Sequence, residues 1–185
     1  MRKLVYESNV SLDGFADHTA AEVVDDELLD YFSRLLDETD IEIFGRVTYQ
    51  LMESYWPYVH KDPKATRGEL EFADRFNAIP KIVFSGTLQK AEWNNTKLIN
   101  GNAIDEVKKL KQQPGKNISI GGISLATALM KAGLIDEYSI LIHPVVAGKG
   151  RQLFEGINEK RKLELADTQI FKSGVVVLHY LPERK

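Results

Sequence analysis

The sequence contains no cysteine, no long apolar run and no concentration of basic residues. Without cysteine the chain cannot form disulfides, bind zinc through thiolates or use a thiol nucleophile, and it suits a reducing compartment such as the cytoplasm. No apolar stretch approaches the ~20 residues that cross a bilayer, and the first apolar run breaks at Glu7, too early for a secretory signal. Lysine and arginine are scattered and the net charge is −3, so no basic surface for nucleic acid is indicated. We expect a cytoplasmic protein that binds neither membrane nor nucleic acid.

The remaining composition is that of an ordinary globular protein. The chain has 185 residues, of which 43% are hydrophobic and 28% charged, enough for one well-buried core. Apolar runs of strand type at 3–10, 41–44, 80–85, 96–100, 117–120 and 137–146 alternate with helix-like segments, and two further runs are joined as a hairpin at 172–174. We therefore predict one α/β domain over 1–185, with a mostly parallel central sheet, flanking helices and an antiparallel C-terminal edge.

Three junctions share one pattern, in which a short apolar strand leads to glycine or hydroxyl residues and then to a helix or turn. They are the segments 41–50, 81–88 and 118–127. Ligands of α/β sheets collect beyond the carboxyl ends of strands, where helix N-termini offer free amides to phosphate. Each junction alone is equally typical of a tight turn, but three together, one with an arginine, favour a nucleotide site. The sequence has neither a GxGxxG fingerprint nor a P-loop, and the acidic run at 22–30 indicates a solvated helix start rather than a metal site.

The order of "SLDGF", "FGRVTYQLM", "KIVFSGTL" and "ISIGGISLATALMKAGLIDEYSILIHPVVAGKGRQLF" resembles the dihydrofolate reductase-like superfamily. The resemblance is closest to the reductase (RibD C-terminal) domain of bifunctional riboflavin biosynthesis enzymes and to its stand-alone bacterial relatives. It spans almost the whole chain. It implies a three-layer fold of dihydrofolate reductase type, NADPH as the cofactor and a small-molecule substrate.

The resemblance also implies roles for individual residues. The first junction would hold the NADPH phosphates, and the second the adenosine 2′-phosphate side. The third would lie against the nicotinamide and pyrophosphate, where Gly121 and Gly122 leave space that a Cβ would fill. The cofactor-binding set is Gly45, Arg46, Thr48, Ser85, Gly86, Thr87, Gly121, Gly122, Ile123, Ser124 and Leu125. The early loop, with Ser11, Asp13 and Gly14, would lie near the nicotinamide and the substrate.

Several of these roles compete with structural alternatives. Asp13 is the carboxylate nearest to the presumed hydride site and a candidate proton donor, yet Asp and Gly also favour turns by themselves. Trp56 could stack on a substrate ring or belong to the core. In the loop 147–154, Lys149 or Arg151 could meet a substrate phosphate.

The helix predicted near residue 28 departs from true dihydrofolate reductases, which carry an acid there. Leu28, or at best Leu29, occupies that place, so folate reduction is disfavoured. The prediction is an NADPH-dependent reductase acting on a C=N or C=O group, for which the riboflavin pathway's aminouracil ribosyl phosphate is the family example. A non-catalytic nucleotide-binding module on the same fold is the alternative, and a homodimer is expected because relatives of the riboflavin type pair.

Overall fold

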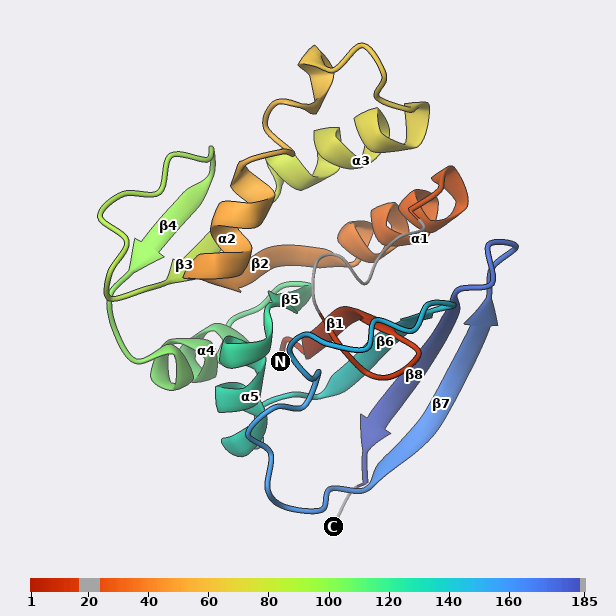
Figure 1. The fold of residues 1–185 in the computed structure, drawn as a ribbon. Coiled ribbons are helices and arrows are strands. Elements are labelled where there is room, and N and C mark those ends of the chain that lie inside the picture. Colours follow the sequence, from red (N-terminus) through yellow and green to blue (C-terminus); the bar gives the residue numbers. More distant parts are fainter. Residues whose placement is uncertain (17–23, 184–185) are drawn as a thin grey trace.

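The protein is described by a computed structural model that covers residues 1–16 and 24–183. Its strands form one eight-stranded sheet in the order β4-β3-β2-β5-β1-β6-β8-β7, in which β4 to β6 run parallel and β8 and β7 are antiparallel (Figure 1). The strands are β1 (Leu4–Ser11), β2 (Thr39–Gly45), β3 (Lys81–Phe84), β4 (Thr96–Ile99), β5 (Asn117–Gly121), β6 (Glu137–His143), β7 (Leu163–Ile170) and β8 (Val176–Pro182). The predicted α/β class with an antiparallel C-terminal edge is confirmed.

Helices cover the two faces of the sheet. In the view of Figure 1, α1 and α3 lie above the sheet and α4 and α5 below it, which gives three layers. Among the described residues the α-helices are α1 (Asp26–Asp37), α2 (Arg46–Glu53), α3 (Arg67–Ala78), α4 (Ala103–Gln112) and α5 (Ile123–Lys131), with a short 3₁₀ turn η1 at Val59–Lys61.

The parallel strands are apolar on both faces because both faces are covered. Side chains alternate between the two faces along a strand. In β2, Ile43 therefore joins the core between the sheet and α4 and α5, while Phe44 joins the aromatic core between the sheet and α1 and α3. Both side chains are at most 2% exposed. The sheet is thus the shared wall of two cores.

Glycine and proline residues mark the ends of α5 and β6 and the turn of the C-terminal hairpin. Gly133 has φ +67° just after α5, and Leu134 N donates to Leu129 O at 3.0 Å, which closes the last turn of that helix. Gly174 has φ +86° in the hairpin between β7 and β8, where Phe171 N donates to Val175 O at 2.9 Å. Strand β6 ends at His143, three residues before the end of the predicted run 137–146, because Pro144 has no N–H to donate to a sheet.

The orientation of α2 differs from the one its sequence suggests. Spacing predicts that Val47, Leu51 and Tyr55 form the apolar face, but Val47 is 70% and Leu51 40% exposed. Tyr49 is fully buried instead, and its hydroxyl donates to Glu53 Oε1 at 2.5 Å. An eight-residue helix has too few apolar positions for periodicity to select a face, and the aromatic core decided it.

Candidate functional site

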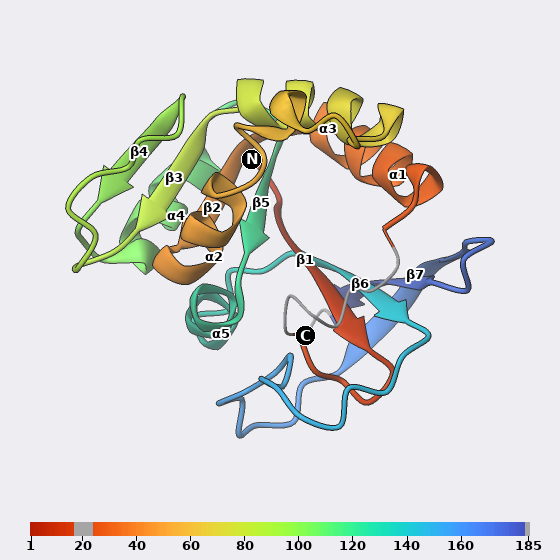
Figure 2. The same cartoon turned by 45° about the horizontal axis from the view of Figure 1, so that its top comes forward.

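The direction of the chain crossovers reverses between β2 and β5. From β2 the chain passes through α2 and α3 to β3 on one side, and from β5 it passes through α5 to β6 on the other side. Figure 2 shows α2 and α5 starting beside each other at the same end of these central strands. This is the topological switch point, where open α/β sheets bind ligands.

Both helices at this point begin without a side-chain cap. Gly45 and Gly122 are the N-cap residues of α2 and α5, and among the described residues no side chain accepts a hydrogen bond from the first amides of either helix. By contrast, α1, α3 and α4 are capped by Asp25, Thr66 and Asn102. The first amides of α2 and α5 therefore remain able to donate to a ligand, with the positive ends of two helix dipoles behind them.

The two helix starts border one cleft of ≈ 340 Å³. Seven predicted cofactor residues line it, and four further residues complete its wall. The lining is Ala16, Gly45, Arg46, Val47, Thr48, Leu51, Gly122, Ile123, Ser124, Leu125 and Arg151. The walls of the cleft are largely apolar and carry two guanidinium groups, an arrangement that suits a ligand with rings and negative charge.

The guanidinium groups reach the cleft from different parts of the chain. Arg46 is exposed at the start of α2, and its Nη1 donates to Gln50 Oε1 at 3.0 Å. Arg151 arrives through the bridge between Phe15 and Gln152, and its Nη1 donates to Ser124 Oγ at 3.3 Å. The sequence indicates Arg151 only as one cation of a glycine-rich loop, because nothing local ties that loop to α5.

The second predicted junction lies beside the cleft rather than in it. The Ser85 hydroxyl oxygen accepts from the amides of Thr87 and Leu88 at 3.1 and 2.9 Å, so it holds the turn after β3. Thr87 borders an adjoining surface hollow that Arg46 also lines, whereas neither Ser85 nor Gly86 lines either space. Arg46 thus connects the helix starts to the exit of β3.

Gly121 at the end of β5 and Gly122 directly after it have a packing role that differs from the expected one. A Cβ at Gly121 would lie 2.7 Å from the Phe44 ring, and a Cβ at Gly122 would lie 2.4 Å from Thr48 Oγ1. Gly122 also has φ +102°, which strains any other residue. The first atoms that a side chain would meet belong to β2 and α2, so the glycines let α2 approach β5.

Asp13 is held by the loop that follows β6. Ser11 Oγ donates to its Oδ1 at 2.6 Å, and the amides of Ala147 and Gly148 donate to its two oxygens at 3.0 and 2.8 Å. These hydrogen bonds, that of Ser11 first, lower the pKa of Asp13 to about 2. At neutral pH this carboxylate carries no proton to give, so its proposed role as proton donor gives way to that of a loop anchor. Gly14, with φ +85°, completes the turn.

Trp56 belongs to the aromatic core and does not line the cleft. Its ring centroid lies 4.6 Å from that of Phe72 and 6.0 Å from that of Phe76. We therefore do not retain it as a substrate contact. On α1, Leu28 and Leu29 are 0% and 2% exposed, which leaves apolar side chains where dihydrofolate reductases have an acid.

The sequence model of the RibD C-terminal domain matches residues 2–177. This chain belongs to the RibD C-terminal domain family. Two Bacillus subtilis (strain 168) proteins are similar to this family member along almost their whole length. The uncharacterized protein YyaP is 36% identical over 97% of this chain and 94% of its own, and the uncharacterized protein YwjB is 32% identical over 97% and 98%.

Solved structures share the fold at lower identity. A putative riboflavin biosynthesis protein from Shewanella sp. PV-4 has a TM-score of 0.74 at 19% identity, over 98% of this chain and 99% of that one. Enterococcus faecalis dihydrofolate reductase, solved with NADP(H), has a TM-score of 0.64 at 12% identity, over 98% and 97%. The Thermotoga maritima diaminohydroxyphosphoribosylaminopyrimidine deaminase/5-amino-6-(5-phosphoribosylamino)uracil reductase has a TM-score of 0.66 at 14% identity. The match covers 98% of this chain and 56% of that one. The dihydrofolate reductase-like fold predicted for this RibD C-terminal domain is confirmed.

Within the described residues, no helix is both long and apolar enough to cross a membrane. In the same part of the chain, no three histidine or carboxylate side chains come together as metal ligands would.

Proposed function

We propose that this protein is an NADPH-dependent reductase whose cofactor binds at the cleft between α2 and α5. The observation that carries the proposal is the pair of uncapped helix starts on one cleft with two guanidinium groups. The first amides of α2 and α5 would hold the pyrophosphate, and Thr48, between the two helix starts, could donate its hydroxyl. NADPH, when bound, supplies a hydride from its nicotinamide ring. The protein's part is to orient that ring, exclude water and provide a proton.

Preference for NADPH over NADH would come from groups near the 2′-phosphate. Arg46 can present its fork to phosphate oxygens, and Thr87 borders the same hollow. Ser85 would support this turn rather than touch the ligand, because its oxygen already accepts from two amides. Gly86 would keep the turn close to the strand end.

The acceptor would be a C=N or C=O group in a small heterocyclic or sugar-derived compound. The reference compound is 5-amino-6-(5-phosphoribosylamino)uracil, the substrate named for the Thermotoga reductase of the same fold. Arg151, which also pairs with Glu155, is a candidate cation for an anionic group of the substrate, because it lines the same cleft as Arg46. Ser11, Asp13 and Gly14 would shape the nearby loop without donating a proton.

The cofactor assignment is tested by ligand-induced thermal stabilisation. We expect NADPH to raise the melting temperature more than NADH at equal concentration, since a ligand that binds only the folded state stabilises it. Arg46→Ala should weaken NADPH binding by roughly 10- to 100-fold, the size of a lost charge-assisted contact of about 1.5 to 3 kcal/mol, and should leave NADH binding less affected. Arg67→Ala is the matched control, because Arg67 is an exposed helical arginine on α3 paired with Glu71. Equal stabilisation by both dinucleotides, or an Arg46→Ala variant that binds NADPH as tightly as the wild type, would count against the site.

A non-catalytic nucleotide-binding module is the second candidate. It is favoured by the apolar Leu28 and Leu29 on α1 and by the proton-free Asp13. Oxidation of NADPH with 5-amino-6-(5-phosphoribosylamino)uracil, dihydrofolate or menadione would exclude it.

We also propose a homodimer that works in the cytoplasm. The edge strand β7 exposes Leu165 and Ile170 at 55% and 75%, which is costly on a free sheet edge. A monomeric mass by light scattering would contradict the dimer.

A further inference from the structure

Strand β1 carries a carboxyl group beneath α1. Val5, Glu7 and Asn9 share one face of β1 because side chains alternate along a strand. Glu7 pairs with Ser139 of β6 on one side. On the other side the pairing of β1 with β5 ends at Tyr6 and Ile120, so Glu7 and Gly121 each follow the last paired residue of their strand. Glu7 therefore lies on the strand next to β5, and the end of β5 leads into Gly122, which lines the cofactor cleft.

The Glu7 side chain lines a polar cavity of ≈ 180 Å³ between α1 and the sheet. The Glu7 side chain keeps a partly exposed surface because it faces this cavity, although it lies inside the protein. The cavity extends from Glu7 toward the edge strands and the amino ends of β2 and β5. Its polar and ionisable lining is Glu7, Tyr31, Glu38, Thr39, Asn117, Glu137, Ser139, Asp167, Thr168, Gln169 and His179. The cavity can hold water, because it is both roomy and polar.

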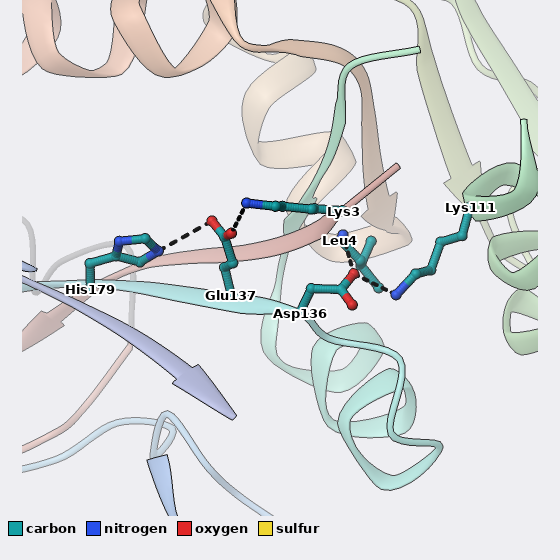
Figure 3. A network of polar contacts seen from close by, with 6 residues as sticks. All are labelled: Lys3, Leu4, Lys111, Asp136, Glu137 and His179. Carbon is teal, nitrogen blue, oxygen red and sulfur yellow. Dashed lines mark hydrogen bonds and ion pairs between the residues drawn. The ribbon is translucent and has the colours of Figure 1, made fainter. Parts of the chain in front are cut away.

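The neighbouring carboxylate Glu137 is already paired. Lys3 Nζ donates to its Oε1 at 2.5 Å, and His179 Nε2 lies 3.2 Å from its Oε2 (Figure 3). Asp136, the next residue, pairs with Lys111 and accepts from Leu4 N at 2.7 Å in the same network. These contacts join β1, α4, β6 and β8 near the amino ends of β1 and β6, and of the residues that form them Glu137 and His179 line the cavity.

Glu7 has a different charge environment. No lysine or arginine of the described residues forms an ion pair with it. Burial first, and the nearby Glu42 second, raise the pKa of Glu7 well above the usual carboxyl range. Burial also raises the pKa of Glu42, although Ser119 and Lys81 oppose the rise. The other ionisable groups around the cavity (Tyr31 from α1, Glu38 at the end of α1, Glu137 from β6, His179 from β8 and Asp167 from β7) include no unpaired cation that would reverse this effect.

Other candidate acids near the cleft end of the sheet are unsuitable. Asp13 holds three hydrogen bonds as a carboxylate. His143 is fully buried with its Nε2 2.9 Å from Asn9 Oδ1, and burial lowers its pKa, so it is uncharged at neutral pH. Leu28 and Leu29 have no proton to give.

We propose that Glu7 is the proton donor of the reductase and that the cavity beneath α1 is the path by which solvent returns the proton. The inference rests on the proposed function. In the reaction the acceptor carbon gains a hydride with two electrons, the π bond of C=N or C=O opens, and its nitrogen or oxygen takes the proton from the Glu7 carboxyl. The Glu7 carboxylate then regains a proton from water in the cavity. The strand supplies the acid that the first helix lacks.

The protonation state of Glu7 is tested without any turnover. Carbon-13 NMR of protein labelled at glutamate carboxyls should contain a signal that titrates above pH 6.5 and disappears in Glu7→Gln, whereas the second raised signal, that of Glu42, remains. Folding provides a second readout. A raised folded-state pKa means that the folded protein binds more protons between the unfolded value, about 4.3, and the folded value, so stability falls as pH rises through that window. Glu7→Gln should remove this part of the fall and melt higher than the wild type at pH 8.

Turnover supplies the remaining test. With whichever of the three acceptors named above supports NADPH oxidation, Glu7→Gln should lower kcat roughly 100-fold or more, as loss of a general acid does, and leave the Kd for NADPH unchanged. Glu164→Gln is the matched control, because Glu164 is an exposed glutamate of the edge strand β7 that does not line the cavity. It should retain the wild-type kcat.

The outcomes separate the two proposals. A Glu7 signal that titrates below pH 6, or a Glu7→Gln variant with wild-type kcat, overturns the role of Glu7. If the wild-type protein still binds NADPH in that case, the proposed function stands. Failure of the wild-type protein to bind NADPH overturns the proposed function first.

Discussion

The backbone amides at helix starts and turns of this molecule fall into two groups. At α1, α3 and α4, and in the loop at Ala147 and Gly148, the protein's own side chains accept from the amides. At α2 and α5 the N-cap is glycine, and no side chain in the described part of the chain accepts from the first amides. The first group stabilises the fold, whereas the second, gathered on one cleft with Arg46 and Arg151, leaves donors for an anion. The proposed function depends on this second group, where local stabilisation is incomplete.

The largest effect is expected from Gly122→Val, which would break the close approach of α2 and α5. The added side chain would collide with Thr48 at a backbone conformation that valine does not adopt. We expect the free energy of unfolding to fall by at least about 3 kcal/mol, measured by chemical denaturation. Gly45→Ala is the control, since a Cβ there meets no atom within 4 Å. If Gly122→Val kept wild-type stability and lost only NADPH binding, the expectation from the sequence that these glycines make room for the cofactor would be the better one.

A smaller effect is expected from Gly45→Asp, which would convert an uncapped start into a capped one. The backbone at Gly45, with φ −81° and ψ 164°, suits an aspartate N-cap. Stability should change by only a few tenths of a kcal/mol, while affinity for NADPH should fall roughly 10-fold, because the new carboxylate occupies the amides and repels phosphate. Isothermal titration calorimetry measures the affinity.

Two controls accompany Gly45→Asp. Gly45→Asn caps without charge and should lose less affinity. Asp25→Ala removes the cap of α1 and should leave NADPH binding unchanged. Equal NADPH affinity in Gly45→Asp and wild type would mean that the amides of α2 do not hold the phosphates.

The smallest effect is expected from Asp13→Asn and appears only as a change in pH dependence. A lowered folded-state pKa means that Asp13 contributes stability above its unfolded value, about 3.9, and that this contribution is lost as the pH falls toward 2. The wild type should therefore lose more melting temperature than Asp13→Asn between pH 5 and pH 2.5. Parallel melting curves for the two proteins would remove Asp13 from the anchor of the 147–148 loop.

Much of the fold could be predicted from the order of residues because its signals are local. Alternating apolar and helical runs, the turn glycines Gly133 and Gly174, and Pro144 after β6 each act within a few residues. The short helix α2 was the exception, since eight residues do not define an apolar face and the contact of Tyr49 with Trp93 set it.

The site could be predicted only in part. The junction glycines and Arg46 follow strands directly, so their pattern is visible in the sequence. Arg151 could be named only as one of two loop cations, because it reaches the cleft through a distant bridge. Glu7 was missed, because in the sequence it looks like an ordinary interruption of an apolar strand.

The sequence by itself determined the alternation of strands and helices, membership of the RibD C-terminal domain family, and the glycine and arginine residues that α2 and α5 present at the switch point. Only the tertiary structure decided which acids hold a proton. Asp13 meets three hydrogen-bond donors and stays ionised, whereas Glu7 is enclosed beneath α1 beside Glu42 and favours the neutral form. The physical reason is that a carboxyl group's pKa depends on the water, charges and donors around it, and these are supplied by residues far away in the chain.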